Sequence, residues 1–183
     1  MRIIAGSKRR LRLKTVDGIE IRPTTDRIKE TLFNMIQNDL PASNFLDLFA
    51  GSGQIGLEAV SRGAKCAVFV EQNKKAAACI MDNIRSTKSE QDCRLIVRDV
   101  FAALRMMEGK YQFDFIFMDP PYGKDLEQKA LCALQNSSLL KEDGVIIVEA
   151  KLGTDFSYLG EMGFALAREK RYKTNVHAFI KRS

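Results

Sequence analysis

The chain has 183 residues, of which 45% are hydrophobic and 28% are charged, which suits one well-buried α/β core and is too short for two ordinary domains. Its four cysteines form no C-x-x-C pair and only one histidine accompanies them, so we expect reduced thiols and no metal site. No signal peptide stands at the N-terminus and no apolar run approaches the roughly 18 residues of a membrane span, so we expect a soluble, cytoplasmic protein with no membrane partner.

Positive charge is concentrated at the two ends of the chain. Residues 1–29 hold nine Lys and Arg against three acids, residues 168–183 hold six against one, and the segment between them is net negative. Clustered cations favour a phosphate polymer through counterion release, although basic ends can also act only as solubility devices. We expect a monomeric catalytic domain with extensions that bind RNA.

The N-terminal segment alternates cations with Ile and Leu, which predicts a small β ribbon over residues 2–22 that turns at Asp17-Gly18. An amphipathic helix is expected from there through Asn38, and a break at residues 40–43 follows it. We therefore take residues 1–40 as an N-terminal unit. The cations of the ribbon that we expect to contact substrate RNA are Lys8, Arg9, Arg10 and Arg12.

Residues 41–183 alternate short apolar runs with helical patterns, which predicts one catalytic domain. After a first strand that begins at Asn44, the predicted strands cover residues 65–70, 94–97, 113–118, 145–149, 165–172 and 176–181. Five strands alternating with helices predict a doubly wound, mostly parallel sheet of the Rossmann-like α/β class. Three residues separate the last two strands, so these must form an antiparallel hairpin that completes a seven-stranded sheet.

Three glycines, Gly51, Gly53 and Gly56, stand at G-x-G-x-x-G spacing between the first strand and the next helix. Glycine lets the backbone approach a ligand closely, and the new helix presents unpaired N–H groups, so the spacing predicts a nucleotide-cradling turn. A ligand-free turn would also tolerate glycines there. Glu71 ends the second strand twenty residues after Gly51, where an acid can accept both hydroxyls of a ribose.

The carboxyl ends of parallel strands form the ligand-binding edge of such a sheet. We therefore expect the residues at the ends of the first four strands to lie together, and they are Asp47, Gly51, Ser52, Gly53, Glu71, Asp99 and Asp119.

The fourth strand is followed by Asp119-Pro120-Pro121-Tyr122. The prolines lack an N–H and fix a stiff turn, so a carboxylate and the Pro120 carbonyl can accept the two N–H bonds of a planar amine. Tyr122 offers an aromatic face for an unstacked base. This motif predicts chemistry at an exocyclic amine, catalysed by positioning and hydrogen bonding, although a simple turn that ends the strand is the alternative.

With these motifs the sequence resembles the class I S-adenosylmethionine-dependent methyltransferases that carry an Asp-Pro-Pro-Tyr type of motif. The residues of the N-terminal segment, including Arg2-Ile3-Ile4-Ala5-Gly6 and Arg22-Pro23-Thr24-Thr25-Asp26-Arg27, resemble the RsmD-type enzymes. The resemblance implies transfer of a methyl group from S-adenosylmethionine to N2 of a guanine in 16S ribosomal RNA, free or in the assembling small subunit.

The resemblance also implies roles for single residues. Glu71 would hold the ribose of the cofactor, Asp99 its adenine, and Thr24 its methionine end, although the adjacent Thr25 leaves that register open. Asp119, Pro120 and Tyr122 would be the catalytic residues.

Three other functions remain open from the sequence alone. A nicotinamide-dependent oxidoreductase would use the same glycine turn but would leave the Asp-Pro-Pro-Tyr motif without a role. A methyltransferase acting on DNA adenine or on a protein glutamine would use related motifs. A non-catalytic RNA-binding protein on the same fold would bind RNA without turnover.

Overall fold

The computed structural model of the chain describes residues 1–16 and 25–183. Its helices are α1 (Asp26–Ile36), α2 (Gln54–Ser61), α3 (Lys74–Ser86), α4 (Val100–Met107), α5 (Leu126–Leu134) and the 3₁₀-helix η1 (Ser157–Met162). Its strands are β1 (Asn44–Asp47), β2 (Cys66–Val70), β3 (Cys93–Ile96), β4 (Phe113–Met118), β5 (Leu140–Lys151), β6 (Phe164–Arg171) and β7 (Asn175–Arg182).

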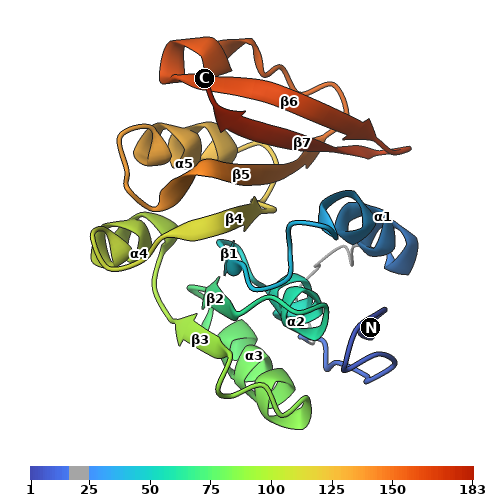
Figure 1. The fold of residues 1–183 in the computed structure, drawn as a ribbon. Helices are drawn as coiled ribbons and strands as arrows, with labels where there is room; N and C mark the ends of the chain where they lie inside the picture. The colour runs from blue at the N-terminus through green and yellow to red at the C-terminus, as the bar shows by residue number, and fades with distance from the viewer. Residues whose placement is uncertain (17–24) are drawn as a thin grey trace.

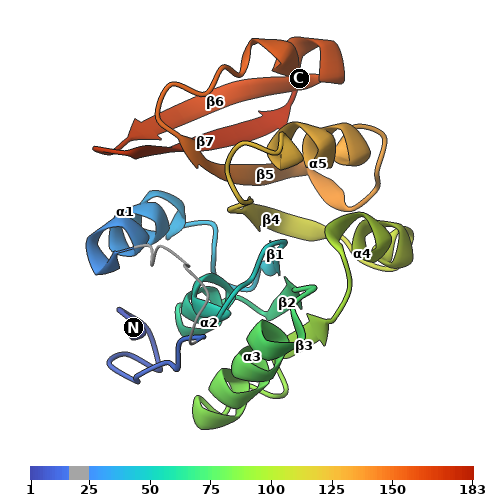
Figure 2. The same ribbon diagram turned by 180° about the vertical axis from the view of Figure 1, so that it is seen from behind.

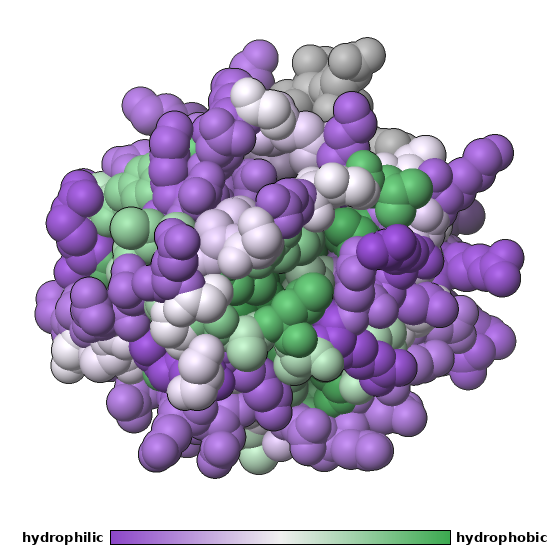
Figure 3. All heavy atoms as spheres, turned by 90° about the horizontal axis from the view of Figure 1, so that it is seen from above, coloured by the Kyte–Doolittle hydropathy of each residue, from purple (hydrophilic) through white to green (hydrophobic). Residues whose placement is uncertain are grey.

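The seven strands form one sheet in the order β3-β2-β1-β4-β5-β7-β6. Strands β1 to β5 are parallel, and β7 runs antiparallel between β5 and the edge strand β6 (Figure 1). The predicted fold class is therefore confirmed. Because β7 has a neighbour on each side, its residues 175–180 are all buried, whereas most of β6 is exposed. Seen from above, the surface at this end of the sheet is mostly hydrophilic (Figure 3).

Helices cover both faces of the sheet, as the two opposite views show (Figures 1 and 2). Side chains of a strand alternate between the faces, and the burial follows that alternation. Phe115 and Phe117 of β4 pack with α1 and α2, whereas Ile116 and Met118 pack with α4 and α5. Within the described residues, no helix is both long and apolar enough to cross a membrane.

Among the strands and the first helix, two elements differ by more than one residue at one end or both from the sequence-based expectation. The strand expected at residues 145–149 is part of the longer β5, which begins at Leu140 and contains the polar run 141–144. Helix α1 ends at Ile36, and residues 37–39 form a turn. The lengthening of β5 comes from pairing between Leu140 and Phe113, with a register shift before Phe115, which no local pattern predicts.

The N-terminal ribbon reverses earlier than expected. An isolated antiparallel bridge joins Arg2 to Arg12, so the chain turns within residues 6–10, and the expected turn at Asp17-Gly18 lies outside the described residues. Gly6 makes this turn possible. Its φ is +84°, and a Cβ atom there would lie 1.7 Å from the carbonyl oxygen of Ser61. Only glycine lets the turn pack this closely on the end of α2.

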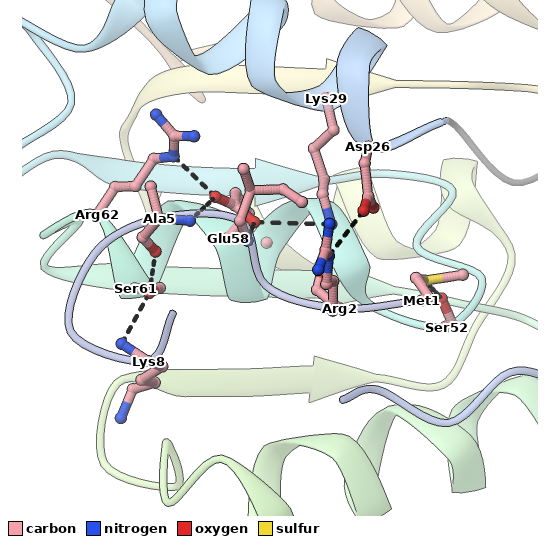
Figure 4. A network of polar contacts seen from close by, with 12 residues as sticks. Met1, Arg2, Ala5, Lys8, Asp26, Lys29, Ser52, Glu58, Ser61 and Arg62 are labelled. Atoms are coloured by element: carbon pink, nitrogen blue, oxygen red, sulfur yellow. Dashed lines mark hydrogen bonds and ion pairs between the residues drawn. The ribbon is translucent and has the colours of Figure 1, made fainter. Parts of the chain in front are cut away.

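A buried carboxylate, Glu58 of α2, fastens this segment to the sheet domain (Figure 4). Its two oxygens accept the backbone N–H groups of Ile4 and Ala5 at 2.8 and 3.0 Å. Arg62 Nε donates to the same carboxylate at 2.8 Å, and Lys29 Nζ lies 3.6 Å from it. Several donors therefore compensate one buried charge.

Lys29 joins α1 to the same cluster. Its ammonium is fully buried and donates to the Arg2 carbonyl at 2.6 Å. Burial lowers the pKa of Lys29, and the charge of Glu58 opposes that shift. The N-terminal segment, α1 and α2 are thus joined through one ion cluster, whose members are interdependent.

Replacing Glu58 by alanine should lower the free energy of unfolding by about 3–5 kcal/mol, because it leaves the Lys29 ammonium buried without its counter-charge. Urea denaturation at neutral pH measures the change. Asp82→Ala is the control, since it breaks an exposed ion pair with Lys14 and should leave the midpoint near that of wild type. Equal small effects of both substitutions would show that the Glu58 cluster does not hold the fold together.

Candidate functional site

The glycine turn between β1 and α2 has the geometry of a close ligand approach. Gly51 and Gly53 adopt positive φ angles of 57° and 78°, and Gly53 occupies the N-cap position of α2. The N-cap residue supplies no side-chain hydrogen bond to the start of α2. The Gly56 N–H of the first turn is bonded to Asp47, and the N–H groups before it face the carboxyl edge of the sheet, where a polar ligand can reach them.

The third glycine has a structural role. A Cβ atom at Gly56 would lie 2.3 Å from the ring of Phe69 in β2. Gly56 therefore allows α2 to pack directly on the sheet, which keeps the glycine turn in place.

Asp47 lies beneath the turn and is 1% exposed. Its Oδ2 accepts the backbone N–H of Gly56 at 3.2 Å. Burial raises the pKa of Asp47 to about 7, and the nearby charge of Glu71 acts in the same direction. Asp47 thus holds the beginning of α2 from below.

Glu71 lies at the end of β2 and reaches back to the turn. Its Oε2 accepts the Gly51 N–H at 2.9 Å, and its Oε1 accepts the Asn73 N–H at 2.8 Å. A carboxylate offers about four lone-pair sites, so each oxygen can still accept one further hydrogen bond. Two adjacent hydroxyls of a ribose match that remaining capacity.

Ser52 and Asp99 complete the predicted cofactor residues that the structure describes, and Thr24 lies outside the described residues. Ser52 is buried, with its hydroxyl 3.4 Å from Met1 Sδ and its carbonyl bonded to Asn83. Asp99 is exposed and caps α4 through the Ala102 N–H at 3.0 Å. Asp47, the glycine turn, Glu71 and Asp99 all lie at or just beyond the ends of β1, β2 and β3.

Asp119 follows β4 and lies at the same edge. Burial raises its pKa to about 8, with further contributions from the charges of Glu149 and Asp47. These surroundings favour the protonated form of its carboxyl group. Pro120 is buried, whereas Tyr122 is 44% exposed.

Sequence reasoning missed a polar row beside Asp119. Glu149 of β5 is buried and bonded to His177 Nε2 at 2.9 Å and to Asn175 Nδ2 at 2.6 Å. Tyr172 OH lies 3.3 Å from the other ring nitrogen of His177. The sequence did contain a signal for Glu149, because this acid follows a run of apolar residues in a strand, as Asp47 and Glu71 do.

A second missed residue is Val97, which follows β3 and is 48% exposed. It precedes Asp99 by two residues and offers apolar surface at the same edge of the sheet. Within the described part of the chain, no group of three His, Cys, Asp or Glu side chains is arranged to hold a metal ion.

The predicted RNA-binding cations lie elsewhere. Arg9, Arg10 and Arg12 are exposed, but the ammonium of Lys8 donates to the carbonyls of Thr87 and Lys88 after α3, at 3.0 and 3.2 Å. The turn that carries Lys8, Arg9 and Arg10 packs on Ser61, the last residue of α2, whereas the glycine turn precedes the first residue. The structure does not bring these cations together with Asp119.

The ligand-free protein should lose stability as pH rises from about 4 to about 8. The pKa of Asp119 is raised from 3.8 to about 8, so in this range the folded state keeps a proton that the unfolded state has released. Asp119→Asn should flatten the decline of the melting temperature, measured by calorimetry. Asp155→Asn should not, because hydrogen bonds from Ser157 lower the pKa of Asp155 out of that range. Parallel curves for wild type and Asp119→Asn would contradict the raised pKa.

Comparison with known proteins identifies the family to which this chain belongs. The model of a family described as conserved hypothetical protein 95 matches residues 1–181. The ribosomal RNA small subunit methyltransferase D of Haemophilus influenzae is 37% identical over 82% of this chain and 79% of that protein. The enzyme of the same name from Escherichia coli K12 is 32% identical, over 83% of this chain and 75% of that protein.

Solved structures agree with the fold. The Escherichia coli protein yhhF superimposes with a TM-score of 0.85 at 30% identity, covering 100% of this chain and 98% of that one. The hypothetical protein TTHA0928 of Thermus thermophilus superimposes with a TM-score of 0.84 at 28% identity, and the match covers 99% of both chains.

Proposed function

Since the chain belongs to the family described as conserved hypothetical protein 95, with methyltransferases D of the small-subunit ribosomal RNA among its similar relatives, we propose that it methylates that RNA. The proposed reaction transfers a methyl group from S-adenosylmethionine to the exocyclic N2 of a guanine. The observation that carries the proposal is the meeting of the glycine turn, Glu71 and the Asp119-Pro120-Pro121-Tyr122 motif at one edge of the sheet.

The cofactor fits the side chains at this edge. Glu71 has acceptor capacity for both ribose hydroxyls, the exposed side chains of Asp99 and Val97 would contact the adenine, and the glycine turn would allow close backbone approach. Asp47, Asp119 and Glu149 make the edge acidic, which favours a cationic ligand. When bound, S-adenosylmethionine supplies an electrophilic methyl group on its sulfonium.

Asp119 and Pro120 would orient the acceptor. An exocyclic base amine is a weak nucleophile, so its nitrogen must be held with its lone pair aimed at the methyl carbon. A carboxyl oxygen of Asp119 and the Pro120 carbonyl accept the two N–H bonds, and a protonated Asp119 still offers its carbonyl oxygen for this purpose. After alkylation the nitrogen is strongly acidic, and its proton leaves to the Asp119 carboxylate or to water.

Tyr122 would hold the guanine outside its stack. The exposed part of its ring gives a flat apolar surface next to Asp119, and base stacking on an aromatic ring is worth about 1–3 kcal/mol. A guanine in a loop is the easiest to extrude, because the unstacking cost is smallest there. A ribosomal RNA substrate also implies a cytoplasmic enzyme that meets free RNA or the assembling subunit.

Wild-type protein should place labelled methyl groups on N2 of guanine in unmodified small-subunit ribosomal RNA, identified by nucleoside mass spectrometry. Asp119→Ala should reduce single-turnover methylation at least about 100-fold, since one preorganised hydrogen bond typically contributes that factor. Cofactor affinity, measured by calorimetry, should remain within a few fold of wild type. Methylation by the variant within threefold of wild type would remove Asp119 from the catalytic role, and methylation of adenine instead of guanine would identify a different acceptor.

The exposed N-terminal arginines would contribute to RNA binding away from the reacting base. Arg9, Arg10 and Arg12 all present their side chains to solvent on a segment that Glu58 holds in place. Lys8 would contribute less, since its ammonium already bonds two carbonyls.

Replacing Arg9, Arg10 and Arg12 with glutamine should weaken RNA binding and flatten its salt dependence, by roughly 0.7–0.9 in the slope of log K against log salt for each lost phosphate contact. Filter binding at several salt concentrations measures the slope. Cofactor affinity serves as the control and should not change. Superimposable slopes for wild type and variant would mean that these arginines act only in solubility.

A further inference from the structure

Four strands place their side chains in one row at the carboxyl edge, on the face that α1 covers. Met118 pairs with Val148, so Asp119 and Glu149 continue that register on adjacent strands. Glu149 pairs with His177, and His177 pairs with Lys170 of the edge strand β6. Adjacent strands lie about 4.8 Å apart, so β6 runs roughly 14 Å from the strand that carries Asp119.

A β-bulge determines which side chains of β6 reach this face. Leu166 pairs with Ile180, but Arg168 pairs with Phe179, so the register shifts between them. Residues directly opposite each other on neighbouring strands point to the same face of the sheet. Ile180 packs on the face that α4 and α5 cover, whereas Phe179 packs on the face that α1 covers. In a regular strand Arg168 would share the face of Leu166. The bulge therefore turns Arg168 and Lys170 toward α1.

The other side chains of this stretch point the opposite way. Glu169 pairs with Ala178 and Arg171 with Val176, which both pack on the α4 and α5 side. Arg171 donates to Glu169 at 3.1 Å, so the cation on that face already has an acid beside it. The bulge thus sorts the charges of β6 by face.

The side chains that face α1 line a groove between α1 and β6. Its volume is about 330 Å³, and its lining consists of Thr31, Asn34, Met35, Arg168 and Lys170. The two cations are exposed, and no acid is among the lining residues. Such a lining suits a polyanion with hydrogen-bonding oxygens and does not suit an apolar peptide.

We propose that this groove binds the phosphate backbone of the substrate RNA, with Arg168 and Lys170 as its contacts, next to the guanine that Asp119 orients. The inference rests on the proposed function and adds a substrate-positioning surface to it. Phosphate contacts fix the register of a nucleic acid on a protein, and both cations lie on the same face of the sheet as Asp119, with Lys170 in its row and Arg168 in the row of Phe117. Their role is to place one nucleotide at Asp119 while neighbouring phosphates lie along β6.

The test compares three variants with wild type on two substrates, which are small-subunit ribosomal RNA transcribed in vitro and small subunits assembled from it. The first is Arg168→Gln with Lys170→Gln. The second exchanges the two cations, Arg168→Lys with Lys170→Arg, and keeps the charge. The matched control, Lys65→Gln with Lys110→Gln, removes the same charge from exposed positions that precede β2 and β4 at the opposite edge of the sheet.

The glutamine variant in the groove should lower the slope of log K against log salt by roughly 1.4–1.8, which is two phosphate contacts. The ratio of the Kd of the variant for RNA to the Kd of wild type should therefore fall roughly ninefold as salt rises from about 50 to about 200 mM. Its KM for RNA should rise while cofactor affinity is unchanged. The exchanged variant and the control should keep a slope close to that of wild type.

The outcomes separate this inference from the proposed function. If wild type fails to methylate any RNA, the proposed function is wrong. If wild type methylates RNA and the groove variant keeps its salt slope and KM, the groove does not bind RNA. A variant that methylates free RNA normally but loses activity only on assembled subunits would indicate a protein contact and would equally overturn the inference.

Discussion

The strand register brings acids together at one edge of the sheet, and the site depends on this arrangement. Three strands place an apolar side chain beneath α1, and these are Phe45, Phe117 and Ile147. Side chains two positions apart on a strand share a face, so the acids that follow, Asp47, Asp119 and Glu149, lie on the same face of the sheet. Burying several carboxyl groups side by side is unfavourable unless protons, hydrogen bonds or a cation compensate. Asp47 uses the Gly56 N–H, Glu149 uses His177 and Asn175, and burial raises the pKa of Asp119 to about 8 and that of Asp47 to about 7. The edge is thus poised for a positively charged ligand, and a bound sulfonium would lower the cost of ionising Asp119.

An acidic reaction centre creates a difficulty for a polyanionic substrate, which the distribution of cations resolves. The middle of the chain is net negative, whereas both ends are strongly basic. The fold places one basic end on β6, beyond β7 in the sheet, and the other on the N-terminal turn that Glu58 fastens to α2. RNA phosphates can then bind away from the acids while one base enters among them. The sheet holds the cations of β6, and the buried ion cluster around Glu58 holds the N-terminal turn. The fold therefore fixes the positions of both basic segments relative to Asp119.

Local sequence patterns predicted the elements well and their long-range contacts poorly. The periodicity gave β4 at residues 113–118 as observed, and Asn73 caps α3 as its residue type suggests. The N-terminal turn depends on contact between Gly6 and Ser61, which are 55 positions apart, and alternating Ile and Leu carry no information about that contact. Lys8 looked like a phosphate ligand from its charge alone, but the carbonyls that it bonds belong to the end of a distant helix. The positions of Asp47, Glu71 and Asp99 were easier to predict, because each of them ends a strand or follows one closely, although their role in binding a cofactor stays a prediction.

The bulge in β6 changes the face of the sheet toward which the cations of this edge strand point. Charged side chains and bulges on edge strands are a common defence against pairing with other chains, so the cations of β6 could have no other role. That explanation requires charge on the strand but does not require it on a particular face. The observed sorting is more specific, since Arg171 pairs with Glu169 on one face whereas Arg168 and Lys170 line an acid-free groove on the other. A strand that only needed protection would gain nothing from turning both cations toward α1, on the face of the sheet that carries Asp119. The asymmetry between the faces therefore favours substrate binding over edge protection as the reason for the bulge.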